Sequence, residues 1–194
     1  MSVALFGGAF DPPHLGHVTL VQHALTHFGF DRLLVVPAGD PPHKEVATAA
    51  DVRARLAHLA FDPIGRVELC PVELKPGGPR YTIETLRWAR ERYEDLTLLV
   101  GADEFADFLH WREPDEILRL APVAVATRPG VSEHEFESVL AALPRPERIV
   151  FFTIPAYSVS SSEVRRRIHQ GRPFDHLVPR AVAAEIERLG LYRD

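Results

Sequence analysis

Residues 2–17 read SVALFGGAFDPPHLGH, a short β-rich run that ends in two glycines and a proline-rich turn. A helical period begins directly after this turn. The stretch 16–28 carries apolar residues at the spacing of one helix face, Val18, Val21, Leu25 and Phe28. A strand that passes through a glycine turn into a helix is typical of the first unit of an α/β fold.

Five further β-rich runs alternate with amphipathic segments along the chain. They are RLLVVPA (32–38), RVELC (66–70), LTLLVGA (96–102), PVAVATR (122–128) and RIVFFTI (148–154). Because parallel strands need crossover connections, and these are right-handed, six such units predict a parallel sheet covered on both faces. We expect a doubly wound, three-layer, Rossmann-like α/β fold formed by a single domain over residues 1–194, with ligands beyond the C-terminal ends of the strands.

Two amphipathic segments carry more specific expectations. In the helix expected over 51–61, Asp51 is able to cap the first turn, and three apolar residues face inward, Val52, Leu56 and Leu59. The segment 180–194 predicts a helix closed by Gly190, with one apolar face made of Val182, Ile186 and Leu189. That face either packs on the domain or meets a second copy of the chain.

Composition and charge exclude several classes of protein. Of 194 residues, 46% are hydrophobic and 25% are charged, and the net charge of −5 provides no general basic field for nucleic acid. No apolar run reaches the roughly 18 residues that span a bilayer, and residues 1–8 do not resemble a secretory signal. We expect a cytoplasmic protein that binds neither membrane nor nucleic acid. The single cysteine, Cys70, is interpreted as a core residue on a strand.

The first candidate site lies in the turn after the first strand. Gly7 and Gly8 lack a Cβ, so a ligand can approach the main chain there, although neither the dinucleotide fingerprint nor the P-loop motif is present. His14 and His17 share one face of the following helix start, where free N–H groups and the helix dipole already favour anions. We interpret the pair as a polyphosphate cradle. The alternative is a metal pair, and Asp11 is interpreted as a turn or cap residue.

A second candidate site lies in SVSSSEVRRRI, residues 158–168. Ser160 and Glu163 have the spacing of a capping box, which predicts another helix start at the sheet edge. Ser161 and Ser162 then present hydroxyl groups in the first turn, and Arg165 can reach back toward a phosphate bound there. The two following arginines, 166 and 167, are interpreted as a solvated face.

Weaker candidates come from the remaining loops. His43 and Lys44 in PPHK are a possible movable clamp over the same phosphates. PRYTIETL predicts a helix that starts at about Thr82, where free amides suit a carboxylate or phosphate. Asp103 follows a strand end, where it can accept hydrogen bonds from a ribose or hold a metal, and Trp111 fits core packing and ligand stacking equally well.

Taken together, GGAFDPPHLGH and SVSSSEVRRRI resemble the paired signature of the nucleotidyltransferase superfamily. The segments PPHK, PRYTIETL, GADEFADFLHW, VATRPG and the terminal GLY follow in order over nearly the whole chain. With them the sequence resembles the bacterial nicotinate-nucleotide adenylyltransferases specifically. The resemblance implies transfer of the adenylyl group of ATP to nicotinate mononucleotide, which gives deamido-NAD and pyrophosphate in NAD biosynthesis, with Mg²⁺ as the cofactor.

The resemblance also implies residue roles. Catalytic roles fall to His14, His17 and Arg165. Contacts with ATP fall to Gly7, Gly8, Ala9, Phe10, His14, His17, His43, Lys44, Asp103, Ser161, Ser162 and Arg165. Contacts with the nicotinate nucleotide fall to Tyr81, Thr82, Trp111 and Arg128. No residue is assigned to a resident metal, the partners are the two nucleotides, and a homo-oligomer is possible.

Other functions remain open at this stage. Another adenylyl- or cytidylyltransferase would act on phosphopantetheine or a polyol phosphate. A non-catalytic ATP-binding module would use the same phosphate cradle, and a zinc protein would use His14, His17 and His43. Arg112, which follows Trp111, is not typical of the resembled pattern, so it leaves the shape of the nicotinate pocket open.

Overall fold

The computed structural model describes residues 1–42, 45–131, 133–156 and 158–193. Within these ranges, one sheet contains the strands β1 (Ser2–Gly8), β2 (Arg32–Pro37), β3 (Val67–Leu69), β4 (Asp95–Gly101), β5 (Val123–Thr127) and β6 (Ile149–Thr153). Neighbouring strands are parallel throughout, in the order β3-β2-β1-β4-β5-β6. The predicted doubly wound parallel sheet is therefore confirmed, and each β-rich run overlaps one of these strands.

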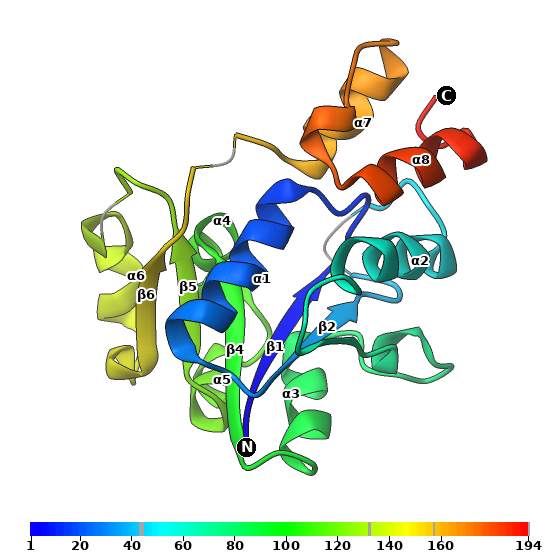
Figure 1. Cartoon of the computed structure of the whole chain (residues 1–194). Helices are drawn as coiled ribbons and strands as arrows, with labels where there is room; N and C mark the ends of the chain where they lie inside the picture. The colour runs from blue at the N-terminus through cyan, green and yellow to red at the C-terminus, as the bar shows by residue number, and fades with distance from the viewer. Residues whose placement is uncertain (43–44, 132, 157, 194) are drawn as a thin grey trace.

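Helices cover both faces of this sheet and make it the middle of three layers (Figure 1). One face carries α1 (Leu15–Phe28), α2 (Ala50–Phe61), α7 (Ser161–His169) and α8 (Arg180–Leu189). The other face carries α3 (Thr82–Arg90), α4 (Ala102–Ala106), α5 (Pro114–Leu120) and α6 (Glu137–Ala142). In the described part of the chain, no helix has both the length and the apolar character to span a bilayer.

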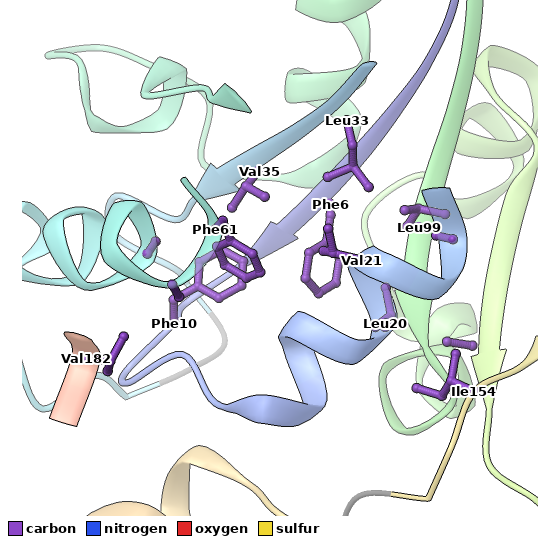
Figure 2. Close-up of a cluster of buried hydrophobic side chains, with 14 of the residues drawn as sticks. Phe6, Phe10, Leu20, Val21, Leu33, Val35, Phe61, Leu99, Ile154 and Val182 are labelled. Atoms are coloured by element: carbon purple, nitrogen blue, oxygen red, sulfur yellow. The ribbon is translucent and has the colours of Figure 1, made fainter. Parts of the chain in front are cut away.

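The two core clusters follow from the alternation of side chains along each strand. Leu33 and Val35 of β2 point into the cluster beneath α1 and α2, whereas Leu34 and Val36 point into the opposite cluster. Figure 2 shows the first of these clusters, in which Leu33 and Val35 lie across from side chains of α1. Because both faces of the strands are buried, their sequences are almost continuously apolar.

The observed helix ends confirm some of the helix boundaries and caps predicted from the sequence and correct others. The helix predicted over 16–28 is α1, which ends at Gly29 with φ 68°, a left-handed conformation that favours glycine. Asp51 does not cap α2: the cap position is Ala49, so Asp51 lies in the first turn and faces the positive helix end. Cys70 is buried as predicted, but it lies one residue beyond β3 rather than on the strand.

The C-terminal helix α8 packs on the domain through only part of its apolar face. Val182 and Ile186 are buried in the core cluster next to α2, whereas Leu189 remains 38% exposed. Glu185 is also buried. It forms an ion pair with Arg55 of α2 at 2.6 Å and accepts two hydrogen bonds from Arg188 of its own helix. The hydrogen bonds from Arg188 lower the pKa of the Glu185 carboxyl, which favours its charged form. The ion pair with Arg55 is therefore a charged contact between α8 and α2.

Candidate active site

The turn after β1 is shaped by close packing of the Phe10 ring against Gly8 and the core. A Cβ on Gly8 would lie 2.9 Å from the ring of Phe10, so this position accepts only glycine without a shift. Phe10 has φ 51°, a strained conformation for a phenylalanine, and its ring packs between Phe6 and Phe61 (Figure 2). The side chain of Phe10 is 1% exposed, so the predicted contact with ATP can involve only its backbone.

The two histidines of the first motif form a stacked pair at the start of α1. His14 is the cap residue and His17 lies three residues later, with ring centroids 3.7 Å apart and planes inclined by 19°. A Cβ on Gly16 would lie 3.1 Å from the His14 ring, tighter than most real contacts, so the glycine of HLGH leaves room for that ring. The sequence placed both side chains on one helix face, and the structure confirms this placement.

Each histidine also caps the helix through its Nδ1 atom. The backbone N–H of His17 donates to Nδ1 of His14 at 3.4 Å, and the N–H of His14 donates to Nδ1 of His17 at 3.2 Å. A ring nitrogen that accepts a hydrogen bond carries no hydrogen, so the neutral ring keeps its proton on Nε2. Each ring is thereby fixed as an Nε2–H donor, which suits an anion rather than a metal ion at that atom.

The N-terminus of α7 packs directly against the turn before α1. Ser161 donates to the carbonyl of Pro12 at 2.8 Å, and Arg165 Nη1 donates to the carbonyl of Asp11 at 2.7 Å. Arg165 Nη2 also lies 3.3 Å from the hydroxyl of Ser162. Residues 149 to 154 positions apart in the chain thus meet at one place, as the two sequence motifs predicted.

The predicted capping box of α7 is only half present. Ser160 accepts from the backbone N–H of Glu163 at 3.2 Å, but the Glu163 carboxylate turns to Arg166 and Arg167 instead of returning to the cap. These two bonds lower the pKa of Glu163, with the one from Arg167 contributing most. Arg166 and Arg167 are therefore paired on their own helix, in accord with their interpretation as a solvated face.

Asp11 is more than the turn residue that the sequence suggested. It is 3% exposed, and its carboxylate accepts from the backbone N–H of Ala47 at 2.5 Å and from the hydroxyls of Thr48 and Tyr192 at 2.7 and 2.9 Å. Arg165 Nη1 lies 4.0 Å from the same carboxylate. Both oxygens are used within the protein, so Asp11 organises the site rather than offering a free carboxylate.

Arg53 is a structural residue of this site that the sequence reading missed. Its side chain is fully buried and donates to the carbonyls of Thr48, Ala9, Ala38 and Gly39 at 2.6 to 3.1 Å. Burial lowers the pKa of the guanidinium, an effect that the nearby Asp11 carboxylate opposes. The signal was present, because Arg53 lies on the same face of α2 as three buried residues, Leu56, Ala57 and Ala60.

Two predicted residues meet beyond the ends of β4 and β5. Asp103 lies in the first turn of α4, and Arg128 directly follows β5. Arg128 Nη2 donates to Asp103 Oδ2 at 2.9 Å, and both side chains are largely exposed. Since β4 lies between β1 and β5 and all three strands are parallel, this pair lies along the same sheet edge as the turn after β1.

Three of the four residues predicted to hold the second nucleotide, Tyr81, Thr82 and Trp111, lie over the other face of the sheet, whereas Arg128 lies at the sheet edge. Tyr81 is the cap residue of α3, whose first residue is Thr82 as predicted, and both Tyr81 and Trp111 pack against the cluster beneath α3. Trp111 contacts Phe108 at a ring distance of 5.3 Å. Arg112 lies with its guanidinium 4.6 Å from the centre of the Tyr81 ring, so this side chain borders the predicted pocket.

The start of α3 is closed by Glu84. Its carboxylate accepts from the backbone N–H groups of Arg80 and Tyr81 at 2.9 and 3.3 Å, and the bond from Arg80 is the main reason that its pKa is lowered. Arg112 lies 3.7 Å from the same carboxylate. An acidic ligand group at this helix end would meet the remaining amides of the first turn and the Arg112 guanidinium.

The described residues and their chemistry limit which ligands this site can hold. His43 and Lys44, the predicted clamp, lie outside the described residues. Among the residues that the structure describes, no group of three or more His, Cys, Asp or Glu side chains is placed to hold a metal ion. Apart from Asp11 and Arg53, which bond within the protein, the groups brought together around the turn after β1 are amides, imidazoles, hydroxyls and the Arg165 guanidinium, a donor set that fits the oxygens of a polyphosphate.

A half-buried acid that is hydrogen-bonded to α3 gives a pH-dependent prediction. Burial raises the pKa of Glu73 to about 7, although a 2.6 Å hydrogen bond from Thr85 opposes the rise. The native protein then holds an extra proton between pH ~4.5 and ~7, so stability falls as the pH rises through this window. We expect Glu73→Gln to be more stable than the wild type at pH 8 by about 1–3 kcal/mol and equal to it near pH 4.

Urea unfolding at several pH values checks this prediction. The exposed Glu94 offers a matched control, because Glu94→Gln should leave the pH profile of the wild type unchanged. A wild-type profile that is flat from pH 5 to pH 8, or a Glu73→Gln variant that is less stable at pH 8, would contradict the assignment of a raised pKa to Glu73.

Comparison with known proteins agrees with this geometry. Residues 5–167 match the family model described as cytidylyltransferase-like. Proteins described as probable nicotinate-nucleotide adenylyltransferases are 38% identical in Thermus thermophilus and 35% identical in Rubrobacter xylanophilus, over all of this chain and 100% and 92% of theirs. The Plasmodium falciparum nicotinic acid mononucleotide adenylyltransferase complexed with NaAD matches 98% of this chain and 97% of its own with a TM-score of 0.81; at 18% identity, it supports the fold alone.

Proposed function

The chain belongs to the cytidylyltransferase-like family and, within it, to the nicotinate-nucleotide adenylyltransferases, and on this basis we propose that it transfers the adenylyl group of ATP to nicotinate mononucleotide. The products are deamido-NAD and pyrophosphate, in NAD biosynthesis. The observation that carries the proposal is the stacked pair of His14 and His17 at one helix start, with Arg165 of a second helix docked on the same turn.

The residues fit the chemical demands of this reaction. The attacking group is the phosphate of the mononucleotide, which is already anionic near neutral pH, so no general base is needed. A bond forms between this phosphate and the α-phosphorus of ATP, while the bond from the α-phosphorus to the bridging oxygen breaks. Catalysis then depends on in-line positioning and on stabilising the charge that builds on pyrophosphate. The Nε2–H groups of His14 and His17 and the Arg165 guanidinium are donors for that charge.

We assign the remaining ATP contacts on the same reasoning. The backbone at Gly7, Gly8 and Ala9 would lie against the nucleotide, and the first turn of α7 would offer its amides and the Ser162 hydroxyl to the phosphates. Ser161 would contribute through its backbone, because its hydroxyl donates to the Pro12 carbonyl. Asp103 would accept from a ribose. Cover from above is assigned to two residues outside the described ranges, His43 and Lys44.

Magnesium belongs to the substrate in this proposal. Mg²⁺ usually binds few protein groups and keeps several waters, and it commonly arrives bound to the phosphates of ATP. The residues present fit an ion that arrives with ATP, because the Asp11 carboxylate is already engaged by one amide and two hydroxyls and lies 4.0 Å from Arg165. The ion supplies charge neutralisation of the phosphates when it is bound with ATP.

We assign nicotinate mononucleotide to the residues around Trp111 and the start of α3, on the other face of the sheet. Its pyridinium ring can stack on Trp111, and its carboxylate can accept from the amides at the start of α3 near Thr82. Arg128 is placed beyond β5, where it would bind the phosphate of the mononucleotide. We also propose a cytoplasmic location, because the reaction consumes ATP.

The preference for the acid over the amide tests the substrate. An amide on the pyridine ring loses charge-assisted hydrogen bonds worth about 1.5–3 kcal/mol each, so we expect kcat/KM for nicotinate mononucleotide to exceed that for nicotinamide mononucleotide by at least about tenfold. Steady-state kinetics with both mononucleotides at saturating ATP and Mg²⁺ measure the ratio. Equal kcat/KM values for the two mononucleotides would contradict the proposed contact with the nicotinate carboxylate.

A further inference from the structure

The chain returns to the phosphate site after α8 through a sharp reversal. Gly190 adopts φ 64° at the helix end, and the N–H of Leu191 donates back to the carbonyl of Ile186 at 3.1 Å. Tyr192 follows with φ 63°, a left-handed conformation that a tyrosine rarely adopts. Its hydroxyl donates to Asp11 Oδ1 at 2.9 Å across 181 positions of sequence. A strained residue that is held by a part-buried hydrogen bond to a buried carboxylate points to a specific role for Tyr192.

Asp11 connects Tyr192 to the segment that follows the predicted clamp. One carboxylate oxygen accepts from the N–H of Ala47, and the other accepts from both Thr48 and Tyr192. Ala47 and Thr48 lie three to four residues beyond Lys44. Loss of the Tyr192 hydroxyl would remove one of the three hydrogen bonds that the buried Asp11 carboxylate accepts within the described part of the chain. The hydrogen bonds from Ala47 and Thr48 would then hold the carboxylate, and with it their own segment, less firmly in place.

The same group connects Tyr192 to Arg165. Arg165 Nη1 donates to the backbone carbonyl of Asp11 at 2.7 Å and lies 4.0 Å from its carboxylate. Beside these groups a cavity of about 330 Å³ opens, lined by Ala47, Ser162, Arg165, Arg166, His169 and Tyr192. The Tyr192 ring therefore forms one wall of a hollow whose other walls carry Ser162 and Arg165, two groups assigned to the phosphates of ATP.

We propose that Tyr192 is a positioning residue for adenylyl transfer, which acts through Asp11 to hold Arg165 and the 45–48 segment in place around the ATP phosphates. The inference rests on the proposed function for its kinetic consequence. The structural part stands independently, because it concerns hydrogen bonds within the protein. Tyr192 itself need not touch the reacting atoms.

A change at Tyr192 is expected to affect ATP and not the nicotinate nucleotide, because the two sets of residues lie on opposite faces of the sheet. Tyr192 and Asp11 belong to the face that carries α1, α2, α7 and α8, whereas Tyr81 and Trp111 belong to the opposite face. A change at Tyr192 should therefore disturb ATP and turnover and leave the nicotinate nucleotide bound as before. A merely structural role would lower stability without this split.

Tyr192→Phe tests the inference, because it removes only the hydroxyl. We expect kcat to fall about tenfold and KM for ATP to rise, while KM for nicotinate mononucleotide stays within about twofold of the wild type. Hydrogen exchange of the Ala47 amide should become about tenfold faster, because that amide donates to Asp11. Tyr93→Phe is the matched control, since Tyr93 packs half-buried against the opposite core cluster, and it should change none of these quantities.

Each outcome has a distinct meaning. A Tyr192→Phe variant with wild-type kcat and wild-type exchange at Ala47 overturns the inference, as does an equal rise in KM for both substrates. A wild-type protein that releases no pyrophosphate from ATP and nicotinate mononucleotide contradicts the proposed function instead. In that case the affinity for ATP is measured by direct titration of the wild type and of Tyr192→Phe. If the variant keeps both the wild-type affinity for ATP and the wild-type exchange rate of the Ala47 amide, the positioning role of Tyr192 is overturned as well.

Discussion

Replacing His17 with alanine is expected to lower kcat about 100-fold or more, while KM for ATP changes only a few-fold. A donor aimed at charge that develops in the transition state is worth about 10²–10³ in kcat, and it contributes much less to binding of the ground state. The stacked ring and the capping bond fix the Nε2–H of His17 as such a donor. Steady-state kinetics with ATP as the varied substrate separate the two constants.

The capping role of His17 calls for a second variant. Alanine removes both the Nε2 donor and the Nδ1 acceptor of the His14 N–H, so it should also cost about 1 kcal/mol of stability. In His17→Asn the amide oxygen can still accept from His14, whereas the distal donor is absent. We expect His17→Asn to lose the same activity but little stability. If either variant raised KM for ATP and kept kcat, His17 would act in binding and not in the chemical step.

Replacing Arg53 with methionine is expected to give the largest loss of stability. The four carbonyls that Arg53 serves belong to three segments, and a buried acceptor without a donor costs about 1–3 kcal/mol. Allowing for water that reaches some of them, we expect a loss of about 3 kcal/mol or more in the free energy of unfolding. Urea denaturation with a common m-value measures this loss.

Arg55 provides the control two residues further along α2. Its side chain is 60% exposed and pairs with Glu185, so Arg55→Met should cost less than about 1 kcal/mol. A similar loss in both variants would mean that the buried bonds of Arg53 are not the cause. A loss below about 1 kcal/mol for Arg53→Met would contradict its role in joining the ends of β1 and β2 to α2.

The parts of the fold set by local pattern were predictable from the sequence. The alternation of β-rich and amphipathic runs gave the parallel sheet, because such sheets have continuously apolar strands and need crossover helices. The spacing of His14 and His17 correctly predicted a shared helix face. The start of α3 at Thr82 and the meeting of the two signature motifs were also confirmed.

The parts set by long-range contacts were not predictable. The sequence predicts only a turn or cap role for Asp11, since nothing near it in sequence reveals that Thr48 and Tyr192 donate to it. The resemblance implies a contact between Phe10 and ATP, and the left-handed φ that turns the ring into the core and limits such a contact to the backbone leaves no sign in the sequence. For Arg53 a local mark existed, because a cation on a buried helix face must find acceptors.

Pyrophosphate release by the purified protein with ATP and Mg²⁺ tests adenylyl transfer most directly. Nicotinate mononucleotide, nicotinamide mononucleotide and phosphopantetheine are compared in parallel, and the dinucleotide product is identified. We predict rapid release with nicotinate mononucleotide and formation of deamido-NAD, with much slower release from the other two. Release with phosphopantetheine alone would keep the phosphate site and contradict the assigned pocket, and no release with any of the three would contradict adenylyl transfer itself.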